Sequence, residues 1–166
     1  MSLDNFQIPL ALVTELYKDS LVVLDSKQLK TESLTGGEFK FFGKNEKKIL
    51  ILVNDPHSVH LSDKDTEFLS GILVACKLSF NDIALMNLAK NKSEAFDKLF
   101  DFFTPLHIIF LGIDPNAYTL PIERNYYQIY QLSNCSYLSG PSLITIAAST
   151  EEKKLLWTAL KKLFSL

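Results

Sequence analysis

Apolar runs alternate with helix-spaced segments over most of the chain. The run at 49–53 is continuously apolar and bounded by turn-forming residues, which is typical of a strand buried on both faces. The segments 83–88 and 107–113 are the next predicted strands. Between the strands, apolar residues recur at helical spacing behind Ser62 and Ser93, which can act as N-caps. This alternation predicts a parallel sheet covered by helices.

The C-terminal third continues the pattern. Residues 126–132 alternate apolar and polar positions and predict a half-exposed edge strand, and 143–147 predicts a fifth strand. Thr150 can cap a last helix, which has acidic residues at its start and lysines at its end, as the helix dipole favours. The predicted fold is α/β, a three-layer sandwich with a mainly parallel central sheet of four to five strands.

The N-terminal part has a different character. Residues 6–17 have helix-compatible spacing and 21–24 predicts a short strand, whereas 27–47 is rich in Gly, Lys and Glu and predicts a loop or hairpin. We therefore expect residues 1–47 to form an appendage of a core domain at 48–166.

Composition indicates an ordinary globular domain. The chain has 166 residues, of which 47% are hydrophobic and 22% charged. Its apolar runs are shorter than the roughly 20 residues of a membrane span, and no export signal begins the sequence. Cys76 and Cys135 lack paired spacing, which is typical of free thiols in a reducing compartment. We expect a cytoplasmic protein.

Charge argues against a dedicated nucleic-acid binder. The net charge is −2, and Arg124 is the single arginine, whereas phosphate-backbone and base recognition draws on clusters of basic side chains. We expect direct nucleic-acid binding to be weak or absent.

Polar residues follow the predicted strands where a parallel sheet binds ligands. Asp55, Asn87 and Asp114 come at the carboxyl ends of three strands, and His57 lies beside Asp55, so that all four are candidates for one crevice. The alternative is structural, because Asp and Asn at strand ends commonly form turns with their own backbone. A small ligand in this crevice is a further possibility, with no indication of its identity.

Four segments in order, ILILVNDPH, IALMNLAK, HIIFLGIDP and SGPSLITIA, resemble the motif segments of the uracil-DNA glycosylase superfamily. The resemblance implies that Asp55 would activate a water molecule and Asn87 would read the base of a flipped nucleotide. The family's Gly-Gln is replaced by Val53-Asn54, and no Tyr follows Pro56. The family's His-Pro-Ser-Pro is replaced by the histidine-free segment 140–143, which removes a main stabiliser of the leaving group.

Residues 48–166 also resemble the psi subunit of bacterial DNA polymerase III and its distant relatives, which have the glycosylase-like fold without the activity. The C-terminal part of this resemblance is carried by Lys153, Leu156, Trp157, Leu160 and Phe164. It implies a non-catalytic accessory protein whose partners are clamp-loader subunits and, indirectly, single-strand-binding protein. The alternative is a divergent base-excision enzyme that uses Asp55 and Asn87.

The last predicted helix has an apolar face of about 200°, wider than the roughly 100° that a surface helix buries. Trp157 and Phe164 lie together at one margin of this face, which makes them candidates for partner binding. The alternative is that the predicted helix at 6–17 packs on them.

Other chemistries have weaker support. His57 and His60, flanked by Asp55 and Asp63, have no motif spacing of a metal site around them. The sequence contains neither a nucleophile elbow nor a phosphate-binding loop. We therefore expect no metal and no cofactor.

Overall fold

A seven-stranded sheet organises the residues that the computed structural model describes, which are 34–36, 39–91, 96–118, 120 and 125–166. The predicted helix at 6–17, the predicted strand at 21–24 and the Ser93 cap lie outside these residues. The strands are β1 (Leu34–Gly36), β2 (Phe39–Phe42), β3 (Ile49–Val53), β4 (Ile83–Asn87), β5 (His107–Leu111), β6 (Ile129–Leu132) and β7 (Cys135–Gly140).

The sheet is mixed. Its order is β1-β2-β4-β3-β5-β7-β6, and the neighbours among the four central strands β4, β3, β5 and β7 are parallel. The pairs β1/β2, β2/β4 and β6/β7 are antiparallel. The α/β class is confirmed, but the prediction of a mainly parallel sheet of four to five strands is wrong, because antiparallel hairpins extend the parallel centre on both sides.

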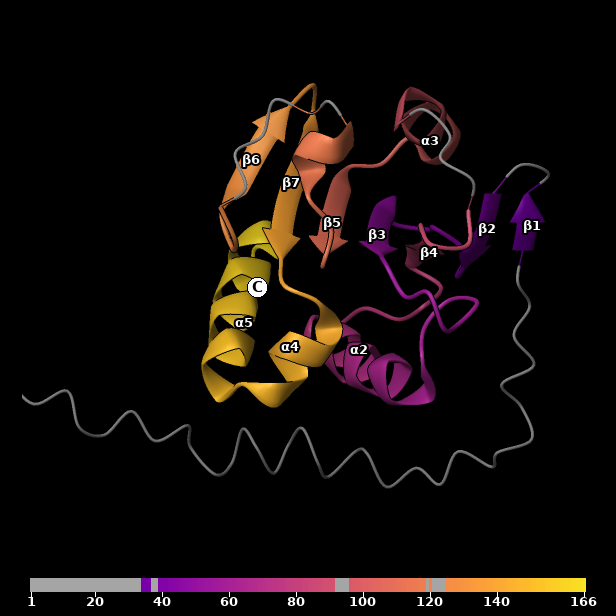
Figure 1. Cartoon of the computed structure of the whole chain (residues 1–166). Helices are drawn as coiled ribbons and strands as arrows, with labels where there is room; N and C mark the ends of the chain where they lie inside the picture. Colours follow the sequence, from indigo (N-terminus) through magenta and orange to yellow (C-terminus); the bar gives the residue numbers. More distant parts are fainter. Residues whose placement is uncertain (1–33, 37–38, 92–95, 119, 121–124) are drawn as a thin grey trace, which may run out of the picture. The chain divides into compact units, whose positions relative to one another are not determined.

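Helices cover both faces of this sheet (Figure 1). Side chains of α2 (Asp63–Ala75), α4 (Leu143–Ala148) and α5 (Thr150–Phe164) pack on one face, and α3 (Phe96–Phe103) packs on the other. The short 3₁₀ helix η1 (Pro115–Tyr118) contributes Tyr118 to the α3 side. None of the described helices has the length and apolar composition of a membrane-spanning segment.

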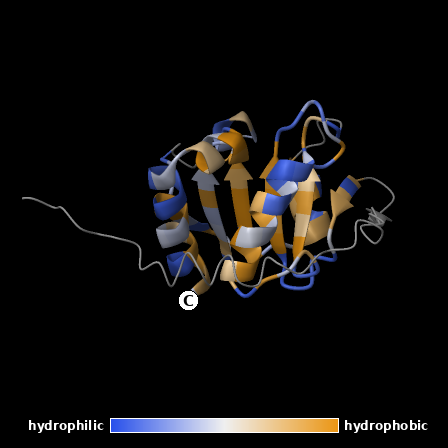
Figure 2. Cartoon of the chain, turned by 90° about the horizontal axis from the view of Figure 1, so that it is seen from below, coloured by the Kyte–Doolittle hydropathy of each residue, from blue (hydrophilic) through white to orange (hydrophobic). Residues whose placement is uncertain are grey.

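Strands β3 and β4 are buried at every position, because both of their faces are covered. Along β3, Ile49, Ile51 and Val53 face α2 and α5, whereas Leu50 and Leu52 face α3. The apolar colouring of the central strands and the polar outer sides of the helices are visible in Figure 2.

The described part of the predicted loop or hairpin at 27–47 contains two strands of the sheet. β1 and β2 form an antiparallel pair, and β2 extends the sheet by pairing with β4. The compact unit that contains the sheet spans Glu32–Leu166. The hairpin joins the core because its alternate side chains, Phe39 and Phe41, are buried on the α3 face.

The predicted strand at 143–147 is wrong, because these residues form the helix α4. Ser142 is its N-cap and accepts a hydrogen bond from the backbone N–H of Thr145. Leu143 and Ile146, one helical turn apart, are buried, and this spacing outweighs the strand preference of the β-branched residues between them.

The fourth parallel strand is β7, which the sequence pattern did not predict. It follows the edge strand β6 through a two-residue turn, Ser133-Asn134, in which both residues have positive φ (49° and 62°). This is the conformation that matches the twist of a hairpin. The edge strand predicted at 126–132 is confirmed as an edge strand, β6, but it begins at Ile129 rather than at 126.

The helix ends follow the expected chemistry. Ser62 caps α2 and accepts from the backbone N–H of Asp65, as predicted. The cap of α5 is Ser149, one residue before the predicted Thr150, and acidic residues begin the helix while lysines end it, as predicted. Tyr127 connects the β6 side of the sheet to this helix by donating a hydrogen bond to the Glu152 carboxylate.

Candidate functional site

The two Asp-Pro corners flank the point where the strand order reverses. From β3 the chain continues to β4 on one side, and then returns to β5 on the other side of β3. The crevice beyond the carboxyl ends of such a strand pair is where open α/β sheets bind ligands. Asp55 follows β3 and Asp114 follows β5, so the sequence prediction places its candidates at the expected end of the sheet.

Asn87, the last residue of β4, has a fully buried side chain (0% exposed). Its Oδ1 accepts the backbone N–H groups of Asp55 (3.0 Å) and Ala89 (3.1 Å). Its Nδ2 donates to the carbonyl oxygens of Asp55 (2.6 Å) and Ser58 (2.9 Å). Both ends of the amide therefore bind backbone groups, and Asn87 fastens the loop after β3 to the end of β4.

Asp55 is half-buried and forms a turn with its own loop. Its Oδ1 accepts the backbone N–H of His57 (2.9 Å). Desolvation raises the pKa of the carboxyl, and hydrogen bonds from Ser58 and His57 outweigh this, so that the pKa lies below its usual value. The carboxylate is thus held ionised, while the His57 side chain lies exposed beside it.

Asp114 forms a similar turn at the neighbouring corner. Its Oδ1 accepts the backbone N–H of Asn116 (3.0 Å) at the start of η1. Just before it, Gly112 has φ of +72°, and its N–H donates to the carbonyl oxygen of Gly140 (3.0 Å). A Cβ on Gly112 would lie 3.0 Å from the Cβ of Ser142, so the ends of β5 and β7 approach each other closely here.

The structure therefore brings Asp55 and Asn87 together through the backbone of the 55–58 loop and places Asp114 in the adjacent loop. Two cavities within the described residues lie elsewhere in the core and at the opposite end of the sheet, and neither is lined by these three residues. The assignment of Asp55, His57, Asn87 and Asp114 as functional residues stays a prediction.

Metal binding and thiol chemistry would depend on other side chains. No group of three or more His, Cys, Asp or Glu side chains is arranged there to hold a metal ion. Cys76 and Cys135 are buried free thiols, and burial raises the pKa of each to about 11, which leaves little thiolate near neutral pH.

The His60 side chain is half-buried, and this affects how the stability of the protein depends on pH. Both ring nitrogens are buried without a hydrogen-bond partner among the described residues, and the ring lies 6.0 Å from that of Phe42. Burial lowers the pKa of His60 because the interior disfavours the imidazolium. The folded state therefore binds fewer protons than the unfolded state as the pH falls through the ordinary range of histidine.

We expect the stability of the protein to fall as the pH is lowered from about 7 to about 5, because the unfolded state takes up the proton that folded His60 resists. His60→Phe, which keeps the ring without its nitrogens, should flatten this dependence in urea titrations. His107, whose pKa is also lowered by burial, contributes in the same direction. An equal pH dependence in His60→Phe and the wild type would contradict the assignment.

The C-terminal helix buries most of its wide apolar face in the core. Leu156, Ala159, Leu160 and Leu163 are buried, and Trp157 and Phe164 are half-buried against the same cluster. The centres of the Phe164 and His107 rings lie 5.4 Å apart in an edge-to-face arrangement. Lys161 Nζ lies 5.8 Å from the centre of the Trp157 ring. Leu155 is the exposed apolar residue of this helix, at 46%. Leu155 and the open side of Trp157 thus lie on opposite flanks of α5, on either side of the buried face.

Neither a comparison with protein-family models nor one with curated proteins gave a match for this chain.

Proposed function

We propose that this protein is a non-catalytic accessory protein that acts through protein contacts. The observation that carries the proposal is the engagement of Asn87. A base-reading amide has to offer its oxygen and nitrogen to a ligand, whereas both are bonded here to the backbone at Asp55, Ser58 and Ala89. Freeing the amide would leave partly buried backbone groups of the 55–58 loop without partners.

We further propose a glycosylase-like fold and a psi-like role in the cytoplasm, with clamp-loader subunits as partners. The positions of the four resembling segments support the fold. The segments that begin at Ile49, Ile83, His107 and Ser139 contain β3, β4, β5 and the end of β7, which are the four central parallel strands. Asp55 and Asn87, which match the family's Asp and Asn, thus lie at the carboxyl ends of β3 and β4.

The proposed contact surface is the exposed flank of α5 around Trp157. Trp157 keeps part of its ring open beside Lys161. A half-buried tryptophan is held in a defined orientation by the core beneath it, so it can act as a rigid anchor for a partner.

Trp157→Ala is expected to weaken binding to purified clamp-loader subunits at least 10-fold in calorimetric titrations of the full chain, because tryptophan is enriched among the hot-spot residues whose truncation costs about 2 kcal/mol or more. Phe102→Ala is the matched control, since Phe102 is an aromatic residue with 45% exposure on α3, which packs on the opposite face of the sheet. Equal affinity of the two variants would contradict the α5 surface. No binding of clamp-loader subunits by the wild type would contradict the psi-like role.

A divergent glycosylase remains the second candidate, because Asp55 and Asn87 are joined by two hydrogen bonds at the ends of adjacent strands. Incubation with uracil-containing single-stranded DNA separates the two functions. Release of uracil that Asp55→Asn abolishes would establish the enzyme and overturn the non-catalytic proposal.

A further inference from the structure

Strand β6 ends the sheet on one side, next to β7 (Figure 1). Among the described strands it pairs with β7 alone. The N–H of Ser136 in β7 donates to the carbonyl oxygen of Leu106 before β5 (2.9 Å), so the backbone of Ser136 faces away from β6. Gln131, which lies opposite Ser136, therefore directs its own N–H and C=O to the outer edge. Ile129, two residues earlier in the same strand, does the same.

The outer edge of β6 lacks the features that usually prevent edge strands from pairing. Such strands are commonly protected by lysine, by other charged side chains or by proline. No charged residue occurs from position 125 to position 150, and the segment 126–132, YYQIYQL, contains neither Pro nor Gly. Its aromatic and β-branched residues favour strands. A strand of this composition can pair with a copy of itself, because no like charges meet.

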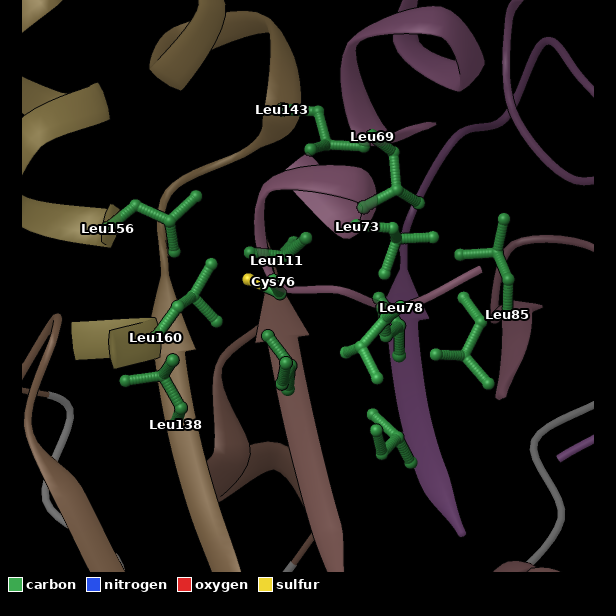
Figure 3. Packing of buried hydrophobic residues seen from close by; sticks show 14 of the residues in the cluster. Leu69, Leu73, Cys76, Leu78, Leu85, Leu111, Leu138, Leu143, Leu156 and Leu160 are labelled. Carbon is green, nitrogen blue, oxygen red and sulfur yellow. The ribbon is translucent and has the colours of Figure 1, made fainter. Parts of the chain in front are cut away.

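The core holds β6 in place from both faces of the sheet. Leu138 of β7, which lies opposite Ile129, belongs to the core cluster that α5 covers (Figure 3). Ile129 packs against the same cluster, and Tyr130 packs against the cluster on the α3 face. A strand that is already ordered in this way loses little further freedom when another strand joins it. The outer edge of β6 is therefore preorganised for pairing.

We propose that β6 pairs antiparallel with β6 of a second copy of the chain, so that two sheets become one across a two-fold axis. An axis at Tyr130 places Ile129 opposite Gln131 of the second copy, and the outward backbone groups of these residues exchange hydrogen bonds. Tyr130 then lies opposite its own counterpart as an aromatic cross-strand pair. Leu132, which is 39% exposed, gains a cross-strand neighbour in Gln128 of the second copy.

Sedimentation equilibrium of the full chain measures this association. Because β6 has four residues, the contact is smaller than a standard interface, and we expect a dissociation constant on the order of 10–100 μM. The N–H groups of Ile129 and Gln131 should exchange more slowly with solvent as the protein concentration rises. A wild type that stays monomeric at about 1 mM would overturn the proposal. The proposal is independent of the accessory function, since it uses neither the Asp-Pro corners nor Trp157.

Gln131→Lys is expected to weaken the dimer at least 10-fold, because it brings the ammonium groups of two copies together at the pairing edge. The matched control is Thr158→Lys, which makes the same change in charge at an exposed position of α5 and should leave the dimer unchanged. An equimolar mixture of Gln131→Lys and Gln131→Glu should associate again as mixed dimers, which misfolded strands could not do. Equal dimerisation of Gln131→Lys and Thr158→Lys, or no recovery in the mixture, would overturn the proposal.

Discussion

Gly43→Ala is expected to destabilise the protein by more than about 4 kcal/mol, enough to unfold most of it under ordinary conditions. Gly43 has φ of +106°, which a residue with a Cβ rarely adopts. The added Cβ would lie 2.2 Å from the carbonyl oxygen of Ile83 and 2.4 Å from that of Phe80. Both contacts are with backbone, so no side-chain rotation can relieve them. Urea denaturation followed by circular dichroism measures the effect.

Gly71→Ala is the control with the opposite expected sign. Gly71 is exposed in the middle of α2, and an added Cβ would meet no atom within 4 Å. The substitution should stabilise the protein by about 0.5–1 kcal/mol, because alanine restricts the unfolded chain and favours the helix. A destabilisation of less than about 1 kcal/mol in Gly43→Ala would show that the turn between β2 and β3 is not constrained in this way.

Asn87→Ala is expected to cost about 3 kcal/mol of stability, because it removes the partners of several partly buried backbone groups in the 55–58 loop. Asn116→Ala, at an exposed position next to Asp114, should change stability by less than about 0.5 kcal/mol. A residue kept for reading a ligand would instead show a small or favourable effect of substitution on stability. A loss of stability below about 1 kcal/mol would therefore contradict the structural role of Asn87 in holding the 55–58 loop. It would favour the glycosylase alternative.

Asn87→Asp tests the donor side of the amide. The carboxylate keeps an acceptor for the Asp55 N–H but loses the donors to the carbonyl oxygens of Asp55 and Ser58. Burial next to carbonyl groups should raise the pKa of the new carboxyl, so the folded state binds the extra proton more strongly. The stability deficit relative to the wild type should accordingly shrink as the pH is lowered from about 7 to about 5.

Much of the central architecture could be predicted from the sequence because its determinants are local. The apolar run at 49–53 lacks polar positions since both faces of β3 are covered, and the Ser62 cap lies directly before its helix. The segments at β4 and β5 were predicted for the same reason.

The elements that were missed depend on context beyond the local pattern. β7 contains Cys135, Ser136, Ser139 and Gly140, and its burial follows from its place between β5 and β6 rather than from its composition. The segment 143–147 contains β-branched residues, and the cap at Ser142 together with tertiary packing makes it helical.

In the candidate site, too, the features set by local sequence could be predicted and those set by distant contacts could not. The turns at Asp55 and Asp114 follow from local Asp chemistry, and the sequence offered them as the structural alternative. The role of Asn87 depends on groups that lie 28 to 32 positions earlier in the chain, so no spacing in the sequence indicates it. The cavity at the amino ends of the strands is lined by β3, β5, α5 and the segments beside them, and likewise leaves no motif.

The central position of β3 bears on how the protein is made. Ile49 pairs with Ile83 and with His107, so this strand is synthesised before either of its neighbours. Until then its five apolar residues have no sheet to join, and a nascent chain in that condition attracts chaperones or other unfinished chains. Slower translation between residues 54 and 107 would prolong this exposure and should lower the yield of native protein.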